Sequence, residues 1–338
     1  MSLLEITDLE TTFDTQAGEI VATDGISFEL EEGETLGIVG ESGSGKSVTA
    51  LSIMGLIRNP GQVKNGSVRF RDKDLHSLSD RELRKLLGRD ISMVFQEASS
   101  ALNPAYTIGH QIEETLEVND YKGDPRERAV DLLEQVGIPS PEENLDKYPH
   151  QYSGGMAQRA MIAIAISREP QLLIADEPTT ALDVTIQAQI LELFNDIQEE
   201  MNMSMIFISH DMGIIWEVCD RVAVMYKGKI VEIAETEQIF KDPKHPYTRG
   251  LLQCLPQVSE QLEPIKGTVP SGATLPGGCT FHPRCEYATD ACVEGFPESA
   301  RVGENHRASC YLYTDHDESG EAPSGKLPQN QNEKPINY

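Results

Sequence analysis

A glycine-rich string of eight residues, GESGSGKS at residues 40–47, narrows the possible folds more than any other stretch of this sequence. It fits the template G-x-x-x-x-G-K-[ST], in which the glycines let consecutive backbone N–H groups curl around phosphate oxygens. A match to this template indicates phosphate binding when a strand precedes the loop and a helix follows it. Residues 35–39 form an apolar strand-like run, and residues 46–57 have a helical pattern. The sequence therefore predicts a strand–loop–helix unit that binds the phosphates of a nucleotide.

This loop supplies most of the nucleotide-binding residues that we expect. Lys46 would reach the β and γ phosphates, and Ser47 would place its hydroxyl on Mg²⁺. The helix that begins here also directs the positive end of its dipole at the phosphates. The loop residues predicted to bind ATP and Mg²⁺ are Gly40, Ser42, Gly43, Ser44, Gly45, Lys46, Ser47 and Val48.

Two carboxylates form the second candidate element of the site. Asp176 and Glu177 follow an apolar run at residues 172–175, and α/β sheets bind ligands at the carboxyl ends of such strands. Asp176 would hold Mg²⁺ through a water molecule, and Glu177 would orient or deprotonate the attacking water. Alone, an acidic pair after a strand is most often part of a solvated loop, but the phosphate loop upstream reverses that expectation.

Apolar runs that suit strands recur along about the first 240 residues and alternate with helical stretches. This pattern predicts an α/β fold with a parallel sheet covered on both faces. The expected strands are residues 20–30, 35–39, 67–71, 91–95, 172–175, 205–209 and 222–226. The expected helices are residues 46–57, 81–87, 111–117, 126–136, 154–167 and 186–200. Residues 227–229, Lys-Gly-Lys, suit a turn between two antiparallel edge strands.

Changes in composition divide the chain into three parts. Residues 1–250 would form the nucleotide-binding domain, and a long stretch without a convincing strand indicates a helical subdomain inserted at about residues 97–168. Residues 256–312 are rich in Pro, Gly and Cys, and residues 251–313 would form a small C-terminal extension. Residues 314–338 are polar, which predicts a disordered tail.

A third motif identifies the family that the chain resembles. The string YSGGM at residues 152–156 opens a predicted helix, follows the phosphate loop and precedes Asp176. In sequence and position it resembles the signature motif of ABC-type ATPases. Three further positions match that family in the family's order. Gln96 matches the Q-loop, Asp183 in the string ALD matches the D-loop, and His210 matches the switch histidine.

The resemblance implies an ABC-type P-loop ATPase, with a RecA-like core, an antiparallel edge subdomain and an inserted helical subdomain. The signature string departs from the family's commonest form at Tyr152 and Met156, where Leu and Gln are usual. Neither position supplies the anion-binding N–H groups, so ATP hydrolysis is still expected.

Members of this family pair head to tail with two ATP molecules at the seam, and the resemblance assigns roles on both sides of it. The expected catalytic residues are Glu177, His210, which would hold the γ-phosphate, and Gln96, which would sense it. Phe13 is the candidate for the ring that stacks on adenine, and Gln96 and Asp176 complete the predicted ATP- and Mg²⁺-binding set. The residues expected to contact ATP held by the other subunit are Ser153, Gly154, Gly155 and Asp183.

Further strings narrow the resemblance to one branch of the family. Residues 96–104 (QEASSALNP), 148–151 (YPHQ) and 245–248 (HPYT) are similar to the ATPase subunits of oligopeptide/dipeptide ABC importers. That resemblance implies a motor on the cytoplasmic face of the membrane, bound to two permease subunits and served by an extracytoplasmic solute-binding protein. The partner ATPase would be a second, similar chain, with a homodimer as the alternative. The transported solute stays open among dipeptides, oligopeptides, nickel and oligosaccharides.

The extension carries four cysteines: Cys279, Cys285, Cys292 and Cys310. Clustered cysteines in a cytosolic protein indicate a metal site rather than disulfides. Their spacing leaves iron–sulfur and zinc open, because it contains no C-x-x-C pair and because His282 or His306 could replace a cysteine as a zinc ligand. Free or disulfide-linked thiols are the third interpretation. The resemblance to the importer branch favours a [4Fe-4S] cluster on all four cysteines.

The charge balance bears on the choice of partner. Lys and Arg number 28 and Asp and Glu 55, a formal net charge of −27, and a surface this acidic repels nucleic-acid phosphates. We therefore expect no nucleic-acid partner, and adaptation to a salty cytoplasm is a further hypothesis.

The chain starts without a basic and apolar leader, and no apolar run approaches the roughly 20 residues of a membrane span, so we expect a cytoplasmic, peripheral subunit. The alternative function is a soluble ABC ATPase outside a transporter, in translation, repair or iron–sulfur assembly.

Overall fold

The computed structural model describes residues 2–118, 120–255, 265–269 and 276–314. Five adjacent parallel strands form the centre of its larger sheet, in the order β6 (Ile91–Val94), β7 (Leu172–Asp176), β8 (Ser204–Ser209), β3 (Thr35–Val39) and β9 (Arg221–Tyr226). Every residue of β3, β7 and β8 is buried, which explains their near-continuous apolar sequence. The predicted parallel sheet is confirmed.

One edge of this sheet continues with antiparallel strands. β10 (Lys229–Glu235) pairs with β9, and Lys227 and Gly228 form the tight turn between them with φ angles of 46° and 80°. This is the turn that the sequence predicts. β12 (His306–Ala308) then pairs with β10, and β11 (Ala300–Gly303) pairs with β12. The C-terminal extension therefore adds two strands to the central sheet, which the sequence did not predict.

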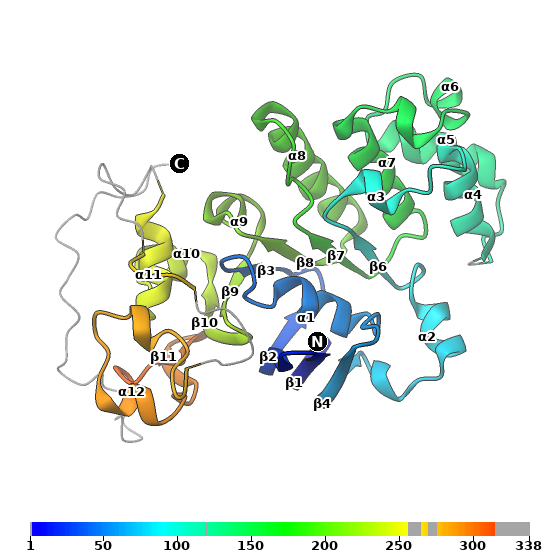
Figure 1. The fold of residues 1–338 in the computed structure, drawn as a ribbon. Helices are drawn as coiled ribbons and strands as arrows, with labels where there is room; N and C mark the ends of the chain where they lie inside the picture. Colours follow the sequence, from blue (N-terminus) through cyan, green and yellow to red (C-terminus); the bar gives the residue numbers. More distant parts are fainter. Residues whose placement is uncertain (1, 119, 256–264, 270–275, 315–338) are drawn as a thin grey trace.

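A smaller antiparallel sheet forms the edge subdomain. Its strands, in spatial order, are β2 (Gly18–Glu31), β1 (Ser2–Thr15), β4 (Gly61–Phe70) and β5 (Lys73–Asp74). β1 lies in the middle of this sheet, and the sequence analysis missed it. Figure 1 shows this sheet and helix α1 (Lys46–Ile53) on one side of the central sheet.

The two faces of the central sheet belong to two hydrophobic cores. Leu172 and Ile174 of β7 pack with the smaller sheet and α1, whereas Leu173 and Ala175 pack with the helices of the opposite face. Side chains alternate in this way because successive residues of a strand point to opposite faces. The helices of the opposite face are α7 (Gly154–Ile166), α8 (Val184–Met201) and α9 (Met212–Val218).

The stretch between β6 and β7 is helical in its described part, as the sequence predicts. It contains α3 (Ala98–Ala101), α4 (Ile108–Val118), α5 (Pro125–Gln135), α6 (Pro141–Leu145), the 3₁₀ turn Pro149–Gln151 and α7. Asp124 caps α5 by accepting the N–H of Arg126, and Pro125 occupies the first turn, where its missing N–H costs nothing. Between β5 and β6 lie a 3₁₀ turn (Leu75–Ser77) and α2 (Asp80–Leu86).

The C-terminal part is attached to the sheet edge through a buried carboxylate. Glu232 of β10 accepts the N–H groups of Lys244 (2.6 Å) and His245 (2.8 Å), and its Oε1 lies 2.7 Å from His306 Nε2 of β12. The helical elements here are α10 (Thr236–Lys241), α11 (Pro246–Gln253), the 3₁₀ turn His282–Arg284 and α12 (Asp290–Glu294). The expected domain boundary at residue 250 thus falls inside α11.

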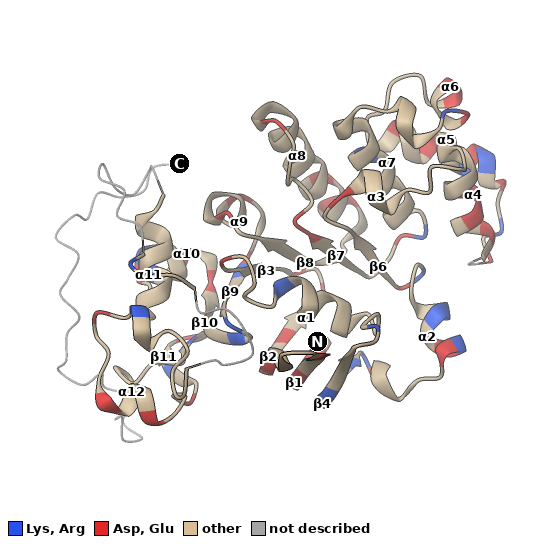
Figure 2. Ribbon diagram, viewed as in Figure 1, with Lys and Arg blue, Asp and Glu red and all other residues tan. Residues whose placement is uncertain are grey.

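Two expectations about the remaining chain can be placed against the structure. Apart from Thr314, the predicted disordered tail lies outside the described residues. Among the described residues, no helix is both long enough and apolar enough to cross a membrane. In Figure 2, acidic positions occur on α4 and α6 at one end of the molecule and on α12 at the other, so the excess negative charge is not confined to one end.

Candidate nucleotide-binding site

The glycine-rich string forms the loop between β3 and α1, as predicted (Figure 1). Gly43 and Gly45 have φ angles of 74° and 104°, in the left-handed region that favours glycine. A Cβ atom on Gly40 would lie 2.2 Å from the carbonyl oxygen of Met225, so only glycine fits there. The other predicted residues of this loop and of the first turn of α1 are Ser42, Ser44, Lys46, Ser47 and Val48.

Lys46 holds its ammonium group against the loop. Nζ donates hydrogen bonds to the carbonyl oxygens of Gly40 (2.7 Å) and Glu41 (3.3 Å) and lies 3.6 Å from Oε1 of Glu177. Burial lowers the pKa of this amine, and the carboxylates of Glu177 and Asp176 oppose the shift. The loop therefore contains a buried cation whose carbonyl and carboxylate partners a phosphate group could replace.

Ser47 and Asp176, the two predicted Mg²⁺-binding residues, are neighbours. Ser47 Oγ donates a hydrogen bond of 3.0 Å to Oδ1 of Asp176 at the end of β7. Burial raises the pKa of Asp176, while the hydrogen bond from Ser47 opposes this shift. A buried carboxylate of this kind gains from a nearby cation, and Mg²⁺ prefers hydroxyl and carboxylate oxygens. Ser47 and Asp176 therefore fit a nucleotide-bound Mg²⁺, which they would hold together with phosphate oxygens and water.

Glu177 brings the three predicted catalytic side chains together. Its Oε2 accepts a hydrogen bond from Nε2 of Gln96 (3.3 Å) and lies 3.1 Å from Nδ1 of His210. Gln96 follows β6, Glu177 follows β7 and His210 follows β8, so the carboxyl ends of three adjacent strands position these side chains. Thr180 also donates to Oε2, at 3.0 Å, and sequence reasoning missed it. Glu177 has a φ angle of 46°, and its N–H is held by the carbonyl of Ile208 at 3.0 Å.

The signature and D-loop residues lie at the starts of two packed helices. Ser153 caps α7, with its Oγ accepting a first-turn N–H at 3.3 Å, and Asp183 caps α8 by accepting the N–H of Ile186 at 3.0 Å. A Cβ atom on Gly155 would lie 2.8 Å from Cγ2 of Ile186, so the two helix starts approach closely. Ser153 and Gly154 are exposed, which leaves the positive end of the α7 dipole accessible to an anion.

Phe13, the candidate for stacking on adenine, lies on β1 opposite Ile20 and Gly61. A Cβ atom on Gly61 would lie 2.5 Å from the Phe13 ring, so the ring packs over this glycine. Phe13 is partly exposed, which leaves some of its surface accessible. Its role in adenine binding stays a prediction.

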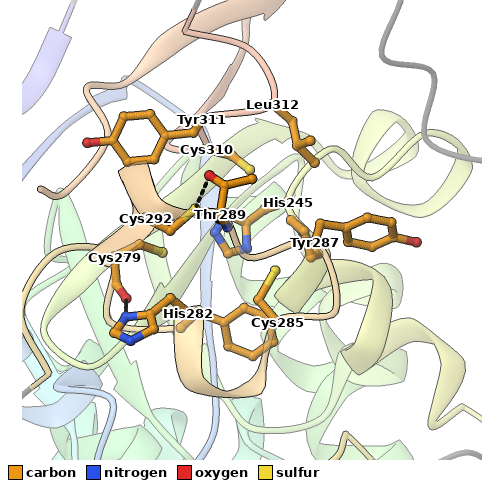
Figure 3. A pocket seen from close by; sticks show the side chains of 12 residues that line it. His245, Cys279, His282, Cys285, Tyr287, Thr289, Cys292, Cys310, Tyr311 and Leu312 are labelled. Atoms are coloured by element: carbon orange, nitrogen blue, oxygen red, sulfur yellow. Dashed lines mark hydrogen bonds between the residues drawn. The ribbon is translucent and has the colours of Figure 1, made fainter. Parts of the chain in front are cut away.

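The four cysteines of the extension line one cavity of about 70 Å³ (Figure 3). All four are free thiols, so the disulfide interpretation finds no support. Burial raises the pKa of Cys285 to about 11 and that of Cys310 to about 12. Although the thiols share this cavity, no group of three or more His, Cys, Asp or Glu side chains in the described part of the chain is placed to hold a metal ion.

The two histidines considered as alternative zinc ligands behave differently. His282 lines the same cavity, and its Nδ1 lies 2.9 Å from the carbonyl oxygen of Cys279. His306 is bonded to the buried carboxylate of Glu232 and is not among the residues that line the cavity. His306 therefore supports the sheet edge, and the sequence interpretation of it as a zinc ligand is wrong.

Comparison with protein families and curated proteins gives consistent matches. A model of the ABC transporter family matches residues 23–180, and a model of the oligopeptide/dipeptide transporter C-terminal region matches residues 231–292. The dipeptide transport ATP-binding protein DppD of Haemophilus influenzae is 48% identical over 316 residues, which cover 92% of this chain and 96% of that protein. The oligopeptide transport ATP-binding protein AppD of Bacillus subtilis is 48% identical over 318 residues, with 92% and 97% covered. DppD of Escherichia coli is 46% identical over 320 residues, with 93% and 98% covered.

Solved structures show the same likeness over the nucleotide-binding part. The ATP-binding cassette MJ0796, in a dimeric post-hydrolysis state bound to ADP and Pi, matches with a TM-score of 0.62 and 27% identity, covering 69% of this chain and 98% of that one. The protein cbiO1 of Clostridium perfringens, part of the ABC transporter complex cbiONQ, matches with a TM-score of 0.59 and 27% identity, covering 71% and 91%.

Proposed function

Because this chain belongs to the ABC transporter family and to its oligopeptide/dipeptide branch, we propose that it is the ATP-hydrolysing motor subunit of an importer for peptides. The observation that carries the proposal is the meeting of Gln96, Glu177 and His210 beside the Ser47–Asp176 pair. Relatives named for dipeptide and oligopeptide transport match nearly the whole chain, which supports peptides as the transported solute.

Each group of the site has a distinct task in ATP hydrolysis. The loop N–H groups and Lys46 bind the β and γ phosphates, and Lys46 exchanges its present carbonyl partners for phosphate oxygens. Ser47 and Asp176 would hold Mg²⁺, which neutralises the phosphate charge when bound. Glu177 accepts a hydrogen bond from the attacking water and orients it, while His210, held beside Glu177, faces the γ-phosphate.

A second ATP-binding chain completes each site. Four residues would contact the ATP bound by the partner: Ser153, Gly154 and Gly155, through the N–H groups at the start of α7, and Asp183, at the start of α8. Val184, next to Asp183, is 82% exposed, as expected for a residue on an association surface. The dimeric state of the similar cassette MJ0796 supports this arrangement. The partner would be a second, similar ATPase chain, with a homodimer as the alternative.

The motor would act on two membrane permease subunits from the cytoplasmic face. Phe95 and Tyr106, on either side of the segment that follows Gln96, are 41% and 47% exposed. Exposed aromatic side chains beside a residue that senses the γ-phosphate suit a docking groove for a permease helix. An extracytoplasmic solute-binding protein would deliver peptide to the permease, and the acidic chain would have no nucleic-acid partner.

The cysteine cavity would hold a [4Fe-4S] cluster on Cys279, Cys285, Cys292 and Cys310. Four thiols around one cavity match the donor set of such clusters, and zinc is the alternative metal. Anaerobic purification should give a brown protein with absorbance near 400 nm and about four irons per chain. A colourless anaerobic sample with stoichiometric zinc would rule the cluster out.

The ATPase assignment is tested by Glu177→Gln, which keeps the shape of the side chain and removes its charge. In the assembled transporter the variant should lose at least about 100-fold in ATP turnover and still bind ATP, because the lost group acts on water rather than on the nucleotide. Glu192→Gln makes the same chemical change at an exposed position on α8 and should leave turnover unchanged. Normal hydrolysis by Glu177→Gln would show that another residue activates the water.

A further inference from the structure

Glu41, the second residue of the phosphate loop, is held by hydrogen bonds at its amide, its carbonyl and its carboxylate. The N–H donates to Oη of Tyr247 at 2.9 Å, and the carboxylate accepts from both Nη atoms of Arg284 at 2.6 and 3.2 Å. The carbonyl oxygen accepts from the N–H of Ser44 at 3.1 Å and from Nζ of Lys46 at 3.3 Å. Tyr247 belongs to α11 and Arg284 to the cysteine-bearing extension, and both are far along the chain from the loop.

Arg284 is buried and fully engaged. Its side chain is 4% exposed, Nη1 also donates to Oη of Tyr226 at 3.3 Å, and Nε donates to the carbonyl of Lys266 at 3.2 Å. The guanidinium carbon lies 5.8 Å from the ring centre of Tyr226 and 5.9 Å from that of Phe281. Burial opposes the charge, but the hydrogen bonds with Glu41 and Tyr226 outweigh it, and the pKa of Arg284 is raised. A bidentate pair of this kind fixes direction as well as distance.

Three aromatic rings fix the residues that hold Glu41. The ring centres of Tyr226 and Tyr247 are 4.6 Å apart, and the ring centre of Phe281 lies 5.2 Å from Tyr226 and 5.4 Å from Tyr247. Tyr247 is fully buried. The rings come from β9, from α11 and from the extension just before Arg284. The central sheet, α11 and the extension therefore form one packed unit against the phosphate loop.

We propose that Arg284 and Tyr247 are positioning residues for the phosphate loop, so that ATP affinity depends on the folded C-terminal region. The proposal rests on the proposed function, since it takes ATP as the ligand of the loop. Neither side chain would touch the nucleotide. They hold Glu41 and thereby keep the loop in the conformation whose N–H groups can bind phosphate. Because Arg284 directly precedes Cys285, an ordered cysteine site and an ordered phosphate loop depend on the same segment of the extension.

A purely structural role for the Arg284–Glu41 pair gives a different result. If the pair only fastens the extension, its loss lowers the melting temperature and leaves the affinity of the folded protein for ATP unchanged. If the pair positions the loop, its loss reduces the fraction of molecules whose loop can bind, and the apparent dissociation constant rises in inverse proportion to that fraction. Affinity measured on the folded protein therefore separates the two roles.

The experiment measures binding of a fluorescent ATP analogue with Mg²⁺ to the full chain at a temperature well below melting. Arg284→Ala and Glu41→Gln each remove the ion pair, and each should raise the dissociation constant about three- to tenfold. The double variant should have about the same dissociation constant as the single variant that binds less tightly, because both substitutions remove the same ion pair. Arg284→Lys keeps the charge but not the bidentate geometry and should lie between Arg284→Ala and the unmodified protein.

Two control variants match the changes made. Arg307→Ala removes an exposed guanidinium group that bonds Ser299 within the extension. Tyr313→Phe removes a hydroxyl that donates to the carbonyl of Lys244, whereas Tyr247→Phe removes the hydroxyl that accepts the Glu41 N–H. Both controls should bind like the unmodified protein, and Tyr247→Phe should bind about two- to fivefold more weakly.

Each outcome decides between the alternatives. If Arg284→Ala disrupts the extension, Glu41→Gln and Tyr247→Phe still report on the loop, because neither removes a side chain of the extension. Unchanged affinity in Arg284→Ala, Glu41→Gln and Tyr247→Phe would overturn the inference, as would effects of Arg284→Ala and Glu41→Gln that multiply in the double variant. Failure of the unmodified chain to bind the analogue would instead contradict the proposed function.

Discussion

Removal of the Glu232 carboxylate should detach the C-terminal extension from the central sheet. Glu232 is 1% exposed and accepts hydrogen bonds from the N–H groups of Lys244 and His245, while pairing with His306 of β12. Glu232→Ala leaves all three partners without an acceptor in a buried site, at about 3–5 kcal/mol. Glu232→Gln keeps one oxygen for Lys244 and His306 but turns an NH₂ group toward the His245 N–H, so we expect a loss of about 2 kcal/mol.

The assay follows both global and local opening. Chemical denaturation gives the free energy of unfolding, and limited trypsin digestion after Arg301 and Arg307 reports opening of β11 and β12. Glu232→Ala should have the lowest free energy of unfolding and the fastest tryptic cleavage, followed by Glu232→Gln. Glu298→Gln, an exposed carboxylate of the same extension, should match the unmodified protein. Equal stability and equal cleavage of Glu232→Ala and Glu298→Gln would refute the argument that this carboxylate joins the extension to the sheet.

Three further predictions concern the loop, the metal ligands and pH. Gly40→Ala should abolish ATP binding, measured by titration, because its Cβ would lie 2.2 Å from a backbone oxygen; normal binding would show that the loop has room for a side chain at this position. Ser47→Ala should remove the gain in ATP affinity that Mg²⁺ provides, and a gain of normal size would show that Ser47 is not a ligand. Burial lowers the pKa of His245 from 6.5 to about 4, so the unfolded chain binds the extra proton between these values. This proton uptake lowers the free energy of unfolding by about 3 kcal/mol as the pH falls from 6.5 toward 4, and above pH 6.5 the full stability is present. The difference in unfolding free energy between the unmodified protein and His245→Asn should therefore shrink over this range, and a constant difference would exclude the mechanism.

The grouping of the candidate site residues was predictable because its signals are local and its geometry is general. Lys46 and Ser47 belong to one short template, and the template fixes the loop conformation. Gln96, Glu177 and His210 each follow an apolar strand, and the carboxyl ends of parallel strands meet at one edge of a sheet. Their meeting at Glu177 therefore follows from strand order, although the sequence alone does not give the distances.

Strand β1 was missed because its pattern is interrupted. Thr11 and Thr12 are buried although they are polar, so the strand lacks the apolar signature that marks its neighbours. Asp8 has a φ angle of 48°, and the pairing of β1 with β2 shifts register between Ile6 and Leu9, the interval that contains it. Such irregularities displace the alternation of inward and outward residues, which is the signal on which strand prediction depends.

The contacts of the extension were beyond sequence reasoning because they are non-local. Arg284 and Glu41 are separated by 243 positions, and nothing in either neighbourhood indicates the other. β12 has only three residues, and it is a strand because β10 offers a free edge. Glu232 interrupts the apolar residues of β10, and its burial becomes understandable only once His306 and the N–H groups beside it are placed.

The central claim is that ATP hydrolysis by this chain drives the import of peptides. It is tested most directly by peptide uptake into proteoliposomes that contain this chain, its partner ATPase and the two permease subunits, with the solute-binding protein supplied on the side of peptide entry. The account predicts ATP-dependent accumulation of labelled peptide that Glu177→Gln abolishes and Glu192→Gln preserves. Sustained ATP hydrolysis without peptide accumulation, or accumulation that survives Glu177→Gln, would contradict it.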